Sequence, residues 1–153
     1  MKIIRIDTTP INIPIHKDKV TLGAKGYHAS SPFLIVEVHT DEGITGLGEV
    51  SCTPLWSGED QVSAAHFIAN LLGPVLIGED PLDRSRLVSR MGTTLANNPF
   101  TKAAIEMALW DIAGKAANLP LYRLLGGAVR ESVQTKYSVS GLEPAKAAAL
   151  AVW

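Results

Sequence analysis

The side chains in this sequence that could do chemistry are few and scattered. Glu106 and Asp111 are the pair whose spacing, just over one helical turn, could turn two carboxylates toward one cation. Exposed acids on a helix surface are the commoner case, and no further carboxylates converge on this pair, so we predict that no metal binds here. The histidines show no metal-ligand spacing: they are His16, His28, His39 and His66. No order of serine, histidine and aspartate suggests a hydrolase.

Two other short features favour structural roles. Residues 46–48 read Gly-Leu-Gly, but a third glycine is missing and no helix follows, so this is not a phosphate-binding loop. Cys52 has no neighbour in the sequence that would lower its pKa, so we predict a packed thiol rather than a reactive one. Because it is the lone cysteine, it cannot form an internal disulfide, which fits a cytoplasmic location.

Two aromatic residues stand in polar segments and are our candidate substrate contacts. Tyr27 lies in a glycine-containing stretch with His28, and Trp56 lies between Cys52 and Gly58. Large aromatic side chains have little reason to occupy polar loops unless they close on an apolar group. Packing against a partner domain is the alternative for both rings, and a solvated histidine is the simpler interpretation of His28.

The first fifty residues must position these loops, and they have the pattern of strands. Alternation predicts strands over residues 11–15, 32–40 and 44–50, and the Asp-Glu-Gly turn at 41–43 makes the last two a hairpin. Pro14 places the first strand at an edge of the sheet. Residues 16–31 show no period, so we predict a long, mobile loop there.

The following residues have the pattern of helices. Ser57 with Asp60 predicts a capping box for a helix that Gly73-Pro74 would end, and Asp80-Pro81 predicts the start of the next helix. The longest helix is predicted over 100–117, with Ala103, Met107 and Trp110 on one face, and a short leucine-rich turn closes at Gly126-Gly127. Strands followed by helices indicate an α+β fold: a three-stranded antiparallel meander and then a helical bundle.

The pattern changes again after residue 127. A predicted strand over 133–140 and a helix from Pro144 to Trp153 make one β/α unit, which cannot bury its own faces because a parallel strand needs neighbours. We therefore predict two domains, a complete one over residues 1–127 and the truncated start of a second over 128–153.

Charge and composition exclude several classes of partner. Fourteen basic and 15 acidic residues give a net charge of −1, and no basic stripe exists to bind nucleic acid or an anionic membrane. The longest apolar runs, such as residues 33–36, have the length of strands rather than membrane spans. Charges within the first seven residues argue against a signal peptide.

Two segments resemble a known family. Residues 98–115 (NPFTKAAIEMALWDIAGK) and 119–127 (LPLYRLLGG) are similar to the first signature of the mandelate racemase and muconate-lactonizing enzymes of the enolase superfamily, and residues 41–49 (DEGITGLGE) resemble that family's hairpin. Thr101 departs from the signature, which usually has alanine, and we expect a helix-surface position there. Within the family, residues 98–102 and 140–141 favour the muconate-lactonizing subgroup.

The resemblance implies a capping domain on a (β/α) barrel whose metal, Mg²⁺, supports abstraction of the proton α to a carboxylate. It implies that the bases and the metal ligands lie on later barrel strands, so we expect no catalytic residue and no bound metal in these residues. The family places two loops over the barrel mouth, where Tyr27 and Trp56 would contact substrate, and puts Ser138 and Ser140 at the end of the first barrel strand.

The expected partners are therefore a small carboxylate substrate, the missing barrel domain and further copies of the chain in a homo-oligomer. The parent would be a cycloisomerase, an epimerase or racemase, or a dehydratase. The alternative is a stand-alone module that binds a small molecule or directs assembly without catalysis. Such a module should end in polar residues, whereas 147–153 are almost wholly apolar, which favours a truncated enzyme.

Overall fold

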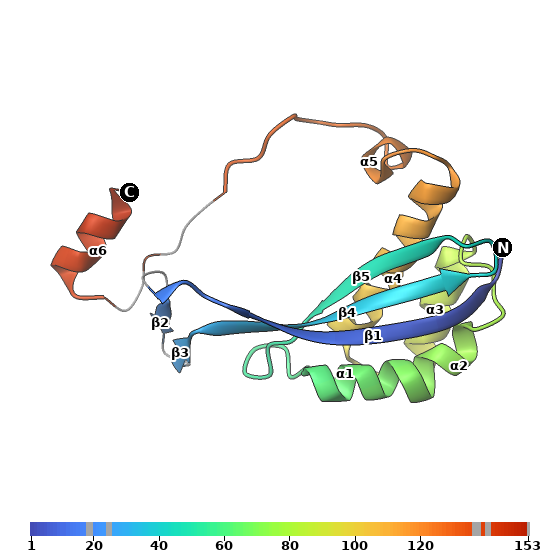
Figure 1. The fold of residues 1–153 in the computed structure, drawn as a ribbon, viewed down its shortest axis with the longest axis horizontal. Helices are drawn as coiled ribbons and strands as arrows, with labels where there is room; N and C mark the ends of the chain where they lie inside the picture. Colours follow the sequence, from blue (N-terminus) through green and yellow to red (C-terminus); the bar gives the residue numbers. More distant parts are fainter. Residues whose placement is uncertain (18–19, 24–25, 136–138, 140–141, 153) are drawn as a thin grey trace.

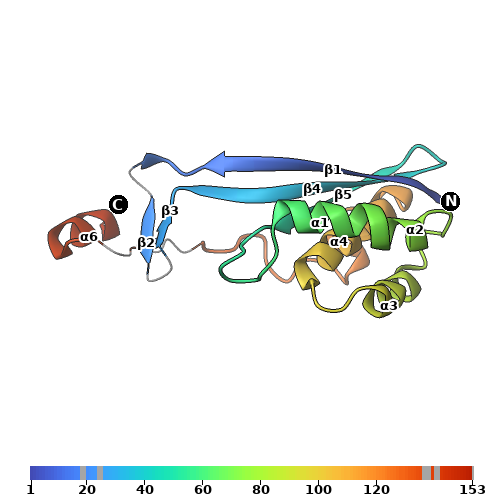
Figure 2. The ribbon, with the colours of Figure 1, turned by 90° about the horizontal axis from the view of Figure 1, so that it is seen from below.

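A computed structural model describes residues 1–17, 20–23, 26–135, 139 and 142–152. Its main sheet is antiparallel, with strands β1 (Ile3–Pro14), β4 (Ser30–Thr40) and β5 (Thr45–Ser51) in the order β1-β4-β5. Helices cover one face of this sheet (Figures 1 and 2). The α+β class and the three-stranded antiparallel sheet are confirmed, and Pro14 ends an edge strand, as its missing N–H requires.

The segment between β1 and β4 differs from the predicted loop. The first strand is longer than predicted and pairs with β4 down to Pro14↔Ser30. Beyond this point β2 (Thr21–Gly23) and β3 (Gly26–His28) pair with each other through Thr21↔His28, Leu22↔Tyr27 and Gly23↔Gly26. Each strand has only three residues, too few to show an alternating pattern in the sequence, so the prediction of an unpatterned loop was wrong here.

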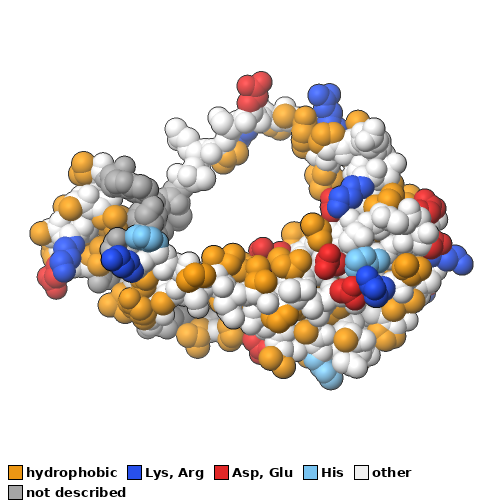
Figure 3. Space-filling view, in the orientation of Figure 1, with side chains coloured by type: hydrophobic (Ala, Val, Ile, Leu, Met, Phe, Trp, Pro, Cys, Tyr) orange, Lys and Arg blue, Asp and Glu red, His pale blue; other side chains and the backbone are white. Residues whose placement is uncertain are grey.

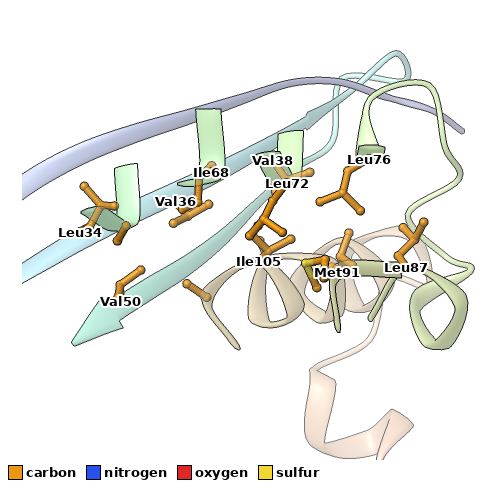
Figure 4. Close-up of a cluster of buried hydrophobic side chains, with 14 of the residues drawn as sticks. Leu34, Val36, Val38, Val50, Ile68, Leu72, Leu76, Leu87, Met91 and Ile105 are labelled. Carbon is orange, nitrogen blue, oxygen red and sulfur yellow. The ribbon is translucent and has the colours of Figure 1, made fainter. Parts of the chain in front are cut away.

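The core lies between the sheet and the helices. Leu34, Val36 and Val38 alternate along the central strand β4 and are fully buried, as expected for the inner face of a sheet. They meet side chains from the helices, as Figure 4 shows: Ile68, Leu72, Leu76, Leu87, Met91 and Ile105.

The first helical segment continues past the predicted end. It comprises α1 (Gln61–Phe67), a π-helical turn η2 (Ile68–Leu72) and α2 (Gly73–Leu76). In the wide turn the N–H of Gly73 donates to the carbonyl of Ile68, five residues back. Pro74, which has no N–H to donate, then lies in the first turn of α2. Single π turns occur inside α-helices and at kinks, and here the helix continues through Gly73-Pro74 with a shift instead of ending.

Two predicted helix starts were also wrong. Asp60, not Ser57, caps α1: its carboxylate accepts from the N–H groups of Val62 (2.7 Å) and Ser63 (2.8 Å). Asp80 accepts from the N–H of Leu82 and so closes a turn before α3 (Arg84–Thr94). Aspartate serves turns and helix caps through the same hydrogen bond, and the sequence pattern alone does not distinguish them.

The longest helix is α4 (Pro99–Ala116), in agreement with the prediction to within a residue. The face that packs on the sheet carries Ala104, Ile105, Ala108, Leu109 and Ile112. The face singled out from the sequence points away from the core, because Ala103 and Met107 are exposed and Trp110 is partly buried. The helix is apolar on both faces, so its period did not show which face packs.

The last third of the chain is only partly regular. Helix α5 (Leu121–Leu124) follows Asn118, and Gly126 and Gly127 close it with positive φ angles, as predicted. Residues 133–135 form no strand, and the rest of the predicted strand, Val139 excepted, lies outside the described residues. A parallel strand needs neighbours for its hydrogen bonds. Helix α6 (Pro144–Ala151) forms as predicted. No helix within the described ranges is long and apolar enough to cross a membrane.

Candidate functional site

The β2–β3 hairpin and the loop over 52–58 lie at the same end of the sheet (Figures 1 and 2). The register explains why: Phe33, near the start of β4, pairs with Ser51 at the end of β5. The hairpin therefore precedes β4 at the point where the 52–58 loop leaves β5. Backbone hydrogen bonds from Ile15 to Ala29 (2.9 Å) and from Cys52 to Pro32 (3.0 Å) hold both segments against the sheet end.

Tyr27 is exposed on the hairpin. It lies opposite Leu22 in the β2–β3 pair, and 70% of its surface is accessible. The neighbouring His28 has its Nε2 atom 3.0 Å from the hydroxyl of Ser31. The hairpin thus exposes an aromatic ring that does not pack into the core.

Trp56 is exposed at the tip of the second loop. The carbonyl of Thr53 accepts hydrogen bonds from the N–H groups of Trp56 (2.9 Å) and Ser57 (2.8 Å), which closes a tight turn. The indole is 78% accessible, and its ring centre lies 6.3 Å from that of Phe100 at the start of α4. The structure therefore places both candidate aromatics at one end of the sheet, on separate segments.

Glu59, which follows this loop, was missed by sequence reasoning. Its carboxylate is buried and accepts hydrogen bonds from the N–H groups of Phe100 (2.9 Å) and Thr101 (2.8 Å) and from the Thr101 hydroxyl (2.7 Å). The partners are 41 and 42 residues away, so no local pattern could have shown them. Thr101 is fully buried, which corrects the prediction of a helix-surface position.

Ser138 and Ser140, the other two predicted substrate contacts, lie outside the described residues. Cys52 is buried, and this burial, with the nearby acids Asp60 and Glu59, raises the pKa of its thiol. A raised pKa disfavours the thiolate, the reactive form.

Glu106 and Asp111 are held in ion pairs. Glu106 accepts from Arg84 at 2.9 Å, and the Arg84 guanidinium also stacks on Trp110, 3.7 Å from the ring centre. Asp111 pairs with Lys115 at 2.7 Å and accepts from the backbone N–H of Leu47 at 2.8 Å. Nowhere in the described part of the chain do three His, Cys, Asp or Glu side chains gather as a metal site. The described residues therefore offer no site that fits Mg²⁺.

The Gly-Leu-Gly segment has a packing role. A Cβ atom on Gly46 would lie 2.0 Å from the carbonyl oxygen of Ala108, and one on Gly48 would lie 1.8 Å from that of Ala104. Only glycine permits this close approach of β5 to α4. The contact, together with the bond from Leu47 to Asp111, fixes the strand from which the Trp56 loop departs.

Comparison with known proteins gives the family. The family described as "Mandelate racemase / muconate lactonizing enzyme, N-terminal domain" matches residues 3–126 of this chain. N-succinyl-L-Arg/Lys racemase of Bacillus cereus is 35% identical over 144 residues, which are 94% of this chain and 38% of that protein. The crystal structure of that racemase matches this chain with a TM-score of 0.91 at 34% identity. The match covers 99% of this chain and 40% of the racemase chain.

Other relatives catalyse different reactions. A chloromuconate cycloisomerase of Cupriavidus pinatubonensis is 36% identical over 134 residues, 85% of this chain and 35% of that protein. A dipeptide epimerase of Cytophaga hutchinsonii, crystallised with Mg and the dipeptide D-Ala-L-Val, has a TM-score of 0.90 at 32% identity and covers 99% of this chain and 40% of that one. The chain spans about two fifths of the length of these relatives.

The match over residues 3–126, together with the sheet-and-helix fold, defines the chain as an N-terminal capping domain. It belongs to the mandelate racemase / muconate lactonizing enzyme family of the enolase superfamily. The resemblance noted over residues 41–49 and 98–127 is thereby confirmed.

Proposed function

We propose that the chain is the substrate-capping and specificity domain of a Mg²⁺-dependent enzyme that abstracts the proton α to a carboxylate. The reaction would be that of a cycloisomerase, an epimerase or racemase, or a dehydratase, and the muconate-lactonizing type is our first choice. The observation that carries the proposal is the exposure of Tyr27 on the β2–β3 hairpin and of Trp56 on the 52–58 loop, two segments at one end of the sheet. The names of the relatives, a racemase, a cycloisomerase and a dipeptide epimerase, support the reaction class.

In this proposal the chain binds and encloses the substrate but does not move the proton. Glu106 and Asp111, the acids whose spacing could suit a cation, are engaged in ion pairs, so the proposal assigns the metal ligands and the bases to residues outside this chain. The two loops would supply apolar contact area and exclude water from the bound carboxylate. The substrate is small, and a cytoplasmic location and a homo-oligomer remain predictions from the sequence.

We also propose that residues 1–127 form the capping domain and that residues 128–153 begin a (β/α) barrel. Helix α6 after the segment around Val133 supports this, since a strand followed by a helix is the repeating unit of such a barrel. Residues 133–135 would become a strand once a neighbouring parallel strand satisfies their backbone groups. Ser138 and Ser140 would then lie at the end of that strand, toward the substrate.

The proposal predicts a change in substrate choice when the loop aromatics are removed. In the complete enzyme, Tyr27→Ala and Trp56→Ala should each change the ratio of kcat/KM between two substrates by about 10-fold, because pocket contacts discriminate by about 1–3 kcal/mol. Exchange of the α-proton with solvent should survive on at least one substrate. Isotope exchange followed by NMR measures both quantities.

Leu82→Ala is the matched control, since it removes a half-exposed apolar side chain from the turn before α3, at the end of the fold opposite the hairpin (Figure 1), and should leave the ratio unchanged. Loss of exchange on every substrate by folded Tyr27 and Trp56 variants would show that the loops take part in the chemistry, against the proposal.

The alternative is a stand-alone binding or assembly module. A hollow of about 770 Å³ between β5, α4 and α5 favours it, and the lining is mainly apolar: Leu47, Met107, Trp110, Leu119, Pro120 and Leu121. The same surface suits the second domain that we propose. Exchange of an α-proton by the complete gene product distinguishes the two, because a module without catalysis would exchange none.

A further inference from the structure

Glu59 is a buried acid that the proposed chemistry does not use. Only 2% of its surface is accessible, and both carboxylate oxygens accept hydrogen bonds from the first turn of α4, at 2.7–2.9 Å. A group that is covered and fully bonded in this way cannot contact substrate. Its function must therefore act through the residues that it connects.

Helix α4 depends on Glu59 for its N-terminal cap. Asn98, the residue just before α4, has a left-handed backbone (φ 50°), and its side chain makes no capping hydrogen bond. The first N–H groups of a helix have no partner within the helix and favour a negative charge. The carboxylate of Glu59 satisfies two of them from a different segment, and the Thr101 hydroxyl adds a third bond.

The same residue is bonded to the Trp56 loop. The backbone N–H of Glu59 donates to the Ser57 hydroxyl (3.2 Å), which itself lies 3.1 Å from the hydroxyl of Thr53. Trp56, three residues before Glu59, places its ring 6.3 Å from that of Phe100, whose N–H binds Glu59. The loop and the start of α4 are thus joined twice, by the carboxylate and by the ring contact.

We propose that Glu59, with Thr101, is a positioning residue that sets the orientation of Trp56 and so tunes substrate choice. This inference rests on the proposed function of the loop. Trp56 is mostly exposed, so its own packing constrains it weakly, and the orientation of its turn relative to α4 depends on the Glu59 bonds. Removing them should change which substrates fit while leaving proton abstraction intact.

The test is a double-mutant cycle in the complete enzyme, with kcat/KM measured for two substrates. Glu59→Gln keeps the size of the side chain but turns an amide donor toward a backbone N–H, and we expect it to shift the substrate ratio about 5-fold, in the same direction as Trp56→Ala. Thr101→Ala removes one of three hydrogen bonds and should shift it about 2-fold. The double variant Glu59→Gln/Trp56→Ala should match Trp56→Ala alone, because Glu59 acts through the ring.

A measurement on residues 1–153 accompanies the kinetics. With 5-fluorotryptophan incorporated, the ¹⁹F resonance of Trp56, assigned with Trp56→Phe, should shift or broaden in Glu59→Gln and less in Thr101→Ala. Leu87→Ala is the matched control: Leu87 is buried at the opposite end of the core from Val50, near which β5 leads into the Trp56 loop (Figure 4), and its loss should leave the Trp56 resonance and the substrate ratio unchanged. If Glu59→Gln fails to fold, Thr101→Ala carries both measurements.

The outcomes separate this inference from the function on which it rests. If Trp56→Ala changes the ratio but Glu59→Gln and Thr101→Ala do not, the positioning role is wrong and the proposed function stands. Additive effects in the double variant also overturn the positioning role. If Trp56→Ala leaves the ratio unchanged, the proposed function fails, and an unchanged ¹⁹F resonance in Glu59→Gln would then overturn the positioning role as well.

Discussion

Gly46 and Gly48 show how one residue type can have two physical meanings. In a sequence, closely spaced glycines suggest a loop that approaches a phosphate. In the structure they allow β5 to approach the carbonyl groups of Ala104 and Ala108 on α4. The glycines are needed because a protein backbone, rather than a ligand, occupies the space of their side chains.

Substituting alanine at these glycines should have opposite effects at packed and open sites. Gly46→Ala and Gly48→Ala should each destabilise the fold by about 3 kcal/mol or prevent folding, since the carbonyl groups that they meet cannot move aside. Gly92→Ala in α3 has nothing within 4 Å of the new Cβ and should stabilise by about 0.5–1 kcal/mol. Urea unfolding measures the free energies; equal effects at Gly46 and Gly92 would contradict the packing role.

Among the elements, the α1–η2–α2 segment is the one whose ends differ most from the pattern in its sequence. It begins at the Asp60 cap and contains the π turn that accommodates Pro74. The cap is charged, and hydrogen bonds from the N–H groups of Ser63 and Val62 hold the pKa of Asp60 below its ordinary value of 3.8. The start of this helix is therefore sensitive to acid.

The lowered pKa of Asp60 predicts a stability that depends on pH. A carboxyl whose pKa is lower in the folded state stabilises the protein above its unfolded pKa, and this contribution is lost as pH falls through the folded value. Asp60→Asn should therefore be less stable than the wild type at pH 7, and the difference should shrink below about pH 4. Thermal unfolding between pH 7 and 2 measures this, and a difference that stays constant with pH would contradict it.

In the molecule as a whole, apolar surface remains uncovered beside the core. Hydrophobic side chains are spread along the side of the body from which the segment after α5 departs (Figure 3). Leu119, Tyr122, Leu125 and Val129 are each 46–92% accessible. Exposed apolar patches of this kind mark sites of interaction, which agrees with the second domain that we propose.

The assignment of metal binding to residues outside this chain predicts a flat titration. Calorimetry of residues 1–153 with Mg²⁺ should show no saturable binding, because Glu106 and Asp111 are committed to Arg84 and Lys115. Asp111→Asn should leave the titration unchanged. Micromolar affinity that this variant abolishes would overturn the structural role of Asp111.

The sequence by itself determined the elements whose pattern is local. Alternation along residues 32–40 predicted the central strand, Asp41-Glu42-Gly43 predicted the hairpin, and the apolar residues over 100–117 predicted the longest helix. These features depend on residues within a few positions of one another, so their period and turn chemistry are visible in one dimension. The family motif was visible for the same reason.

Only the tertiary structure decided which residues meet across the fold. Glu59 and Thr101 are 42 residues apart, and Leu47 and Asp111 are 64 apart. Both contacts exist because α4 packs on the sheet with one particular face. The helix is apolar on both faces, so its sequence does not say which face is buried. Gly46 and Gly48 favour burial of the face that carries Ala104 and Ala108, because they let β5 approach the backbone of α4 there. This contact forms only when α4 packs against β5, so the pattern of neither element shows it.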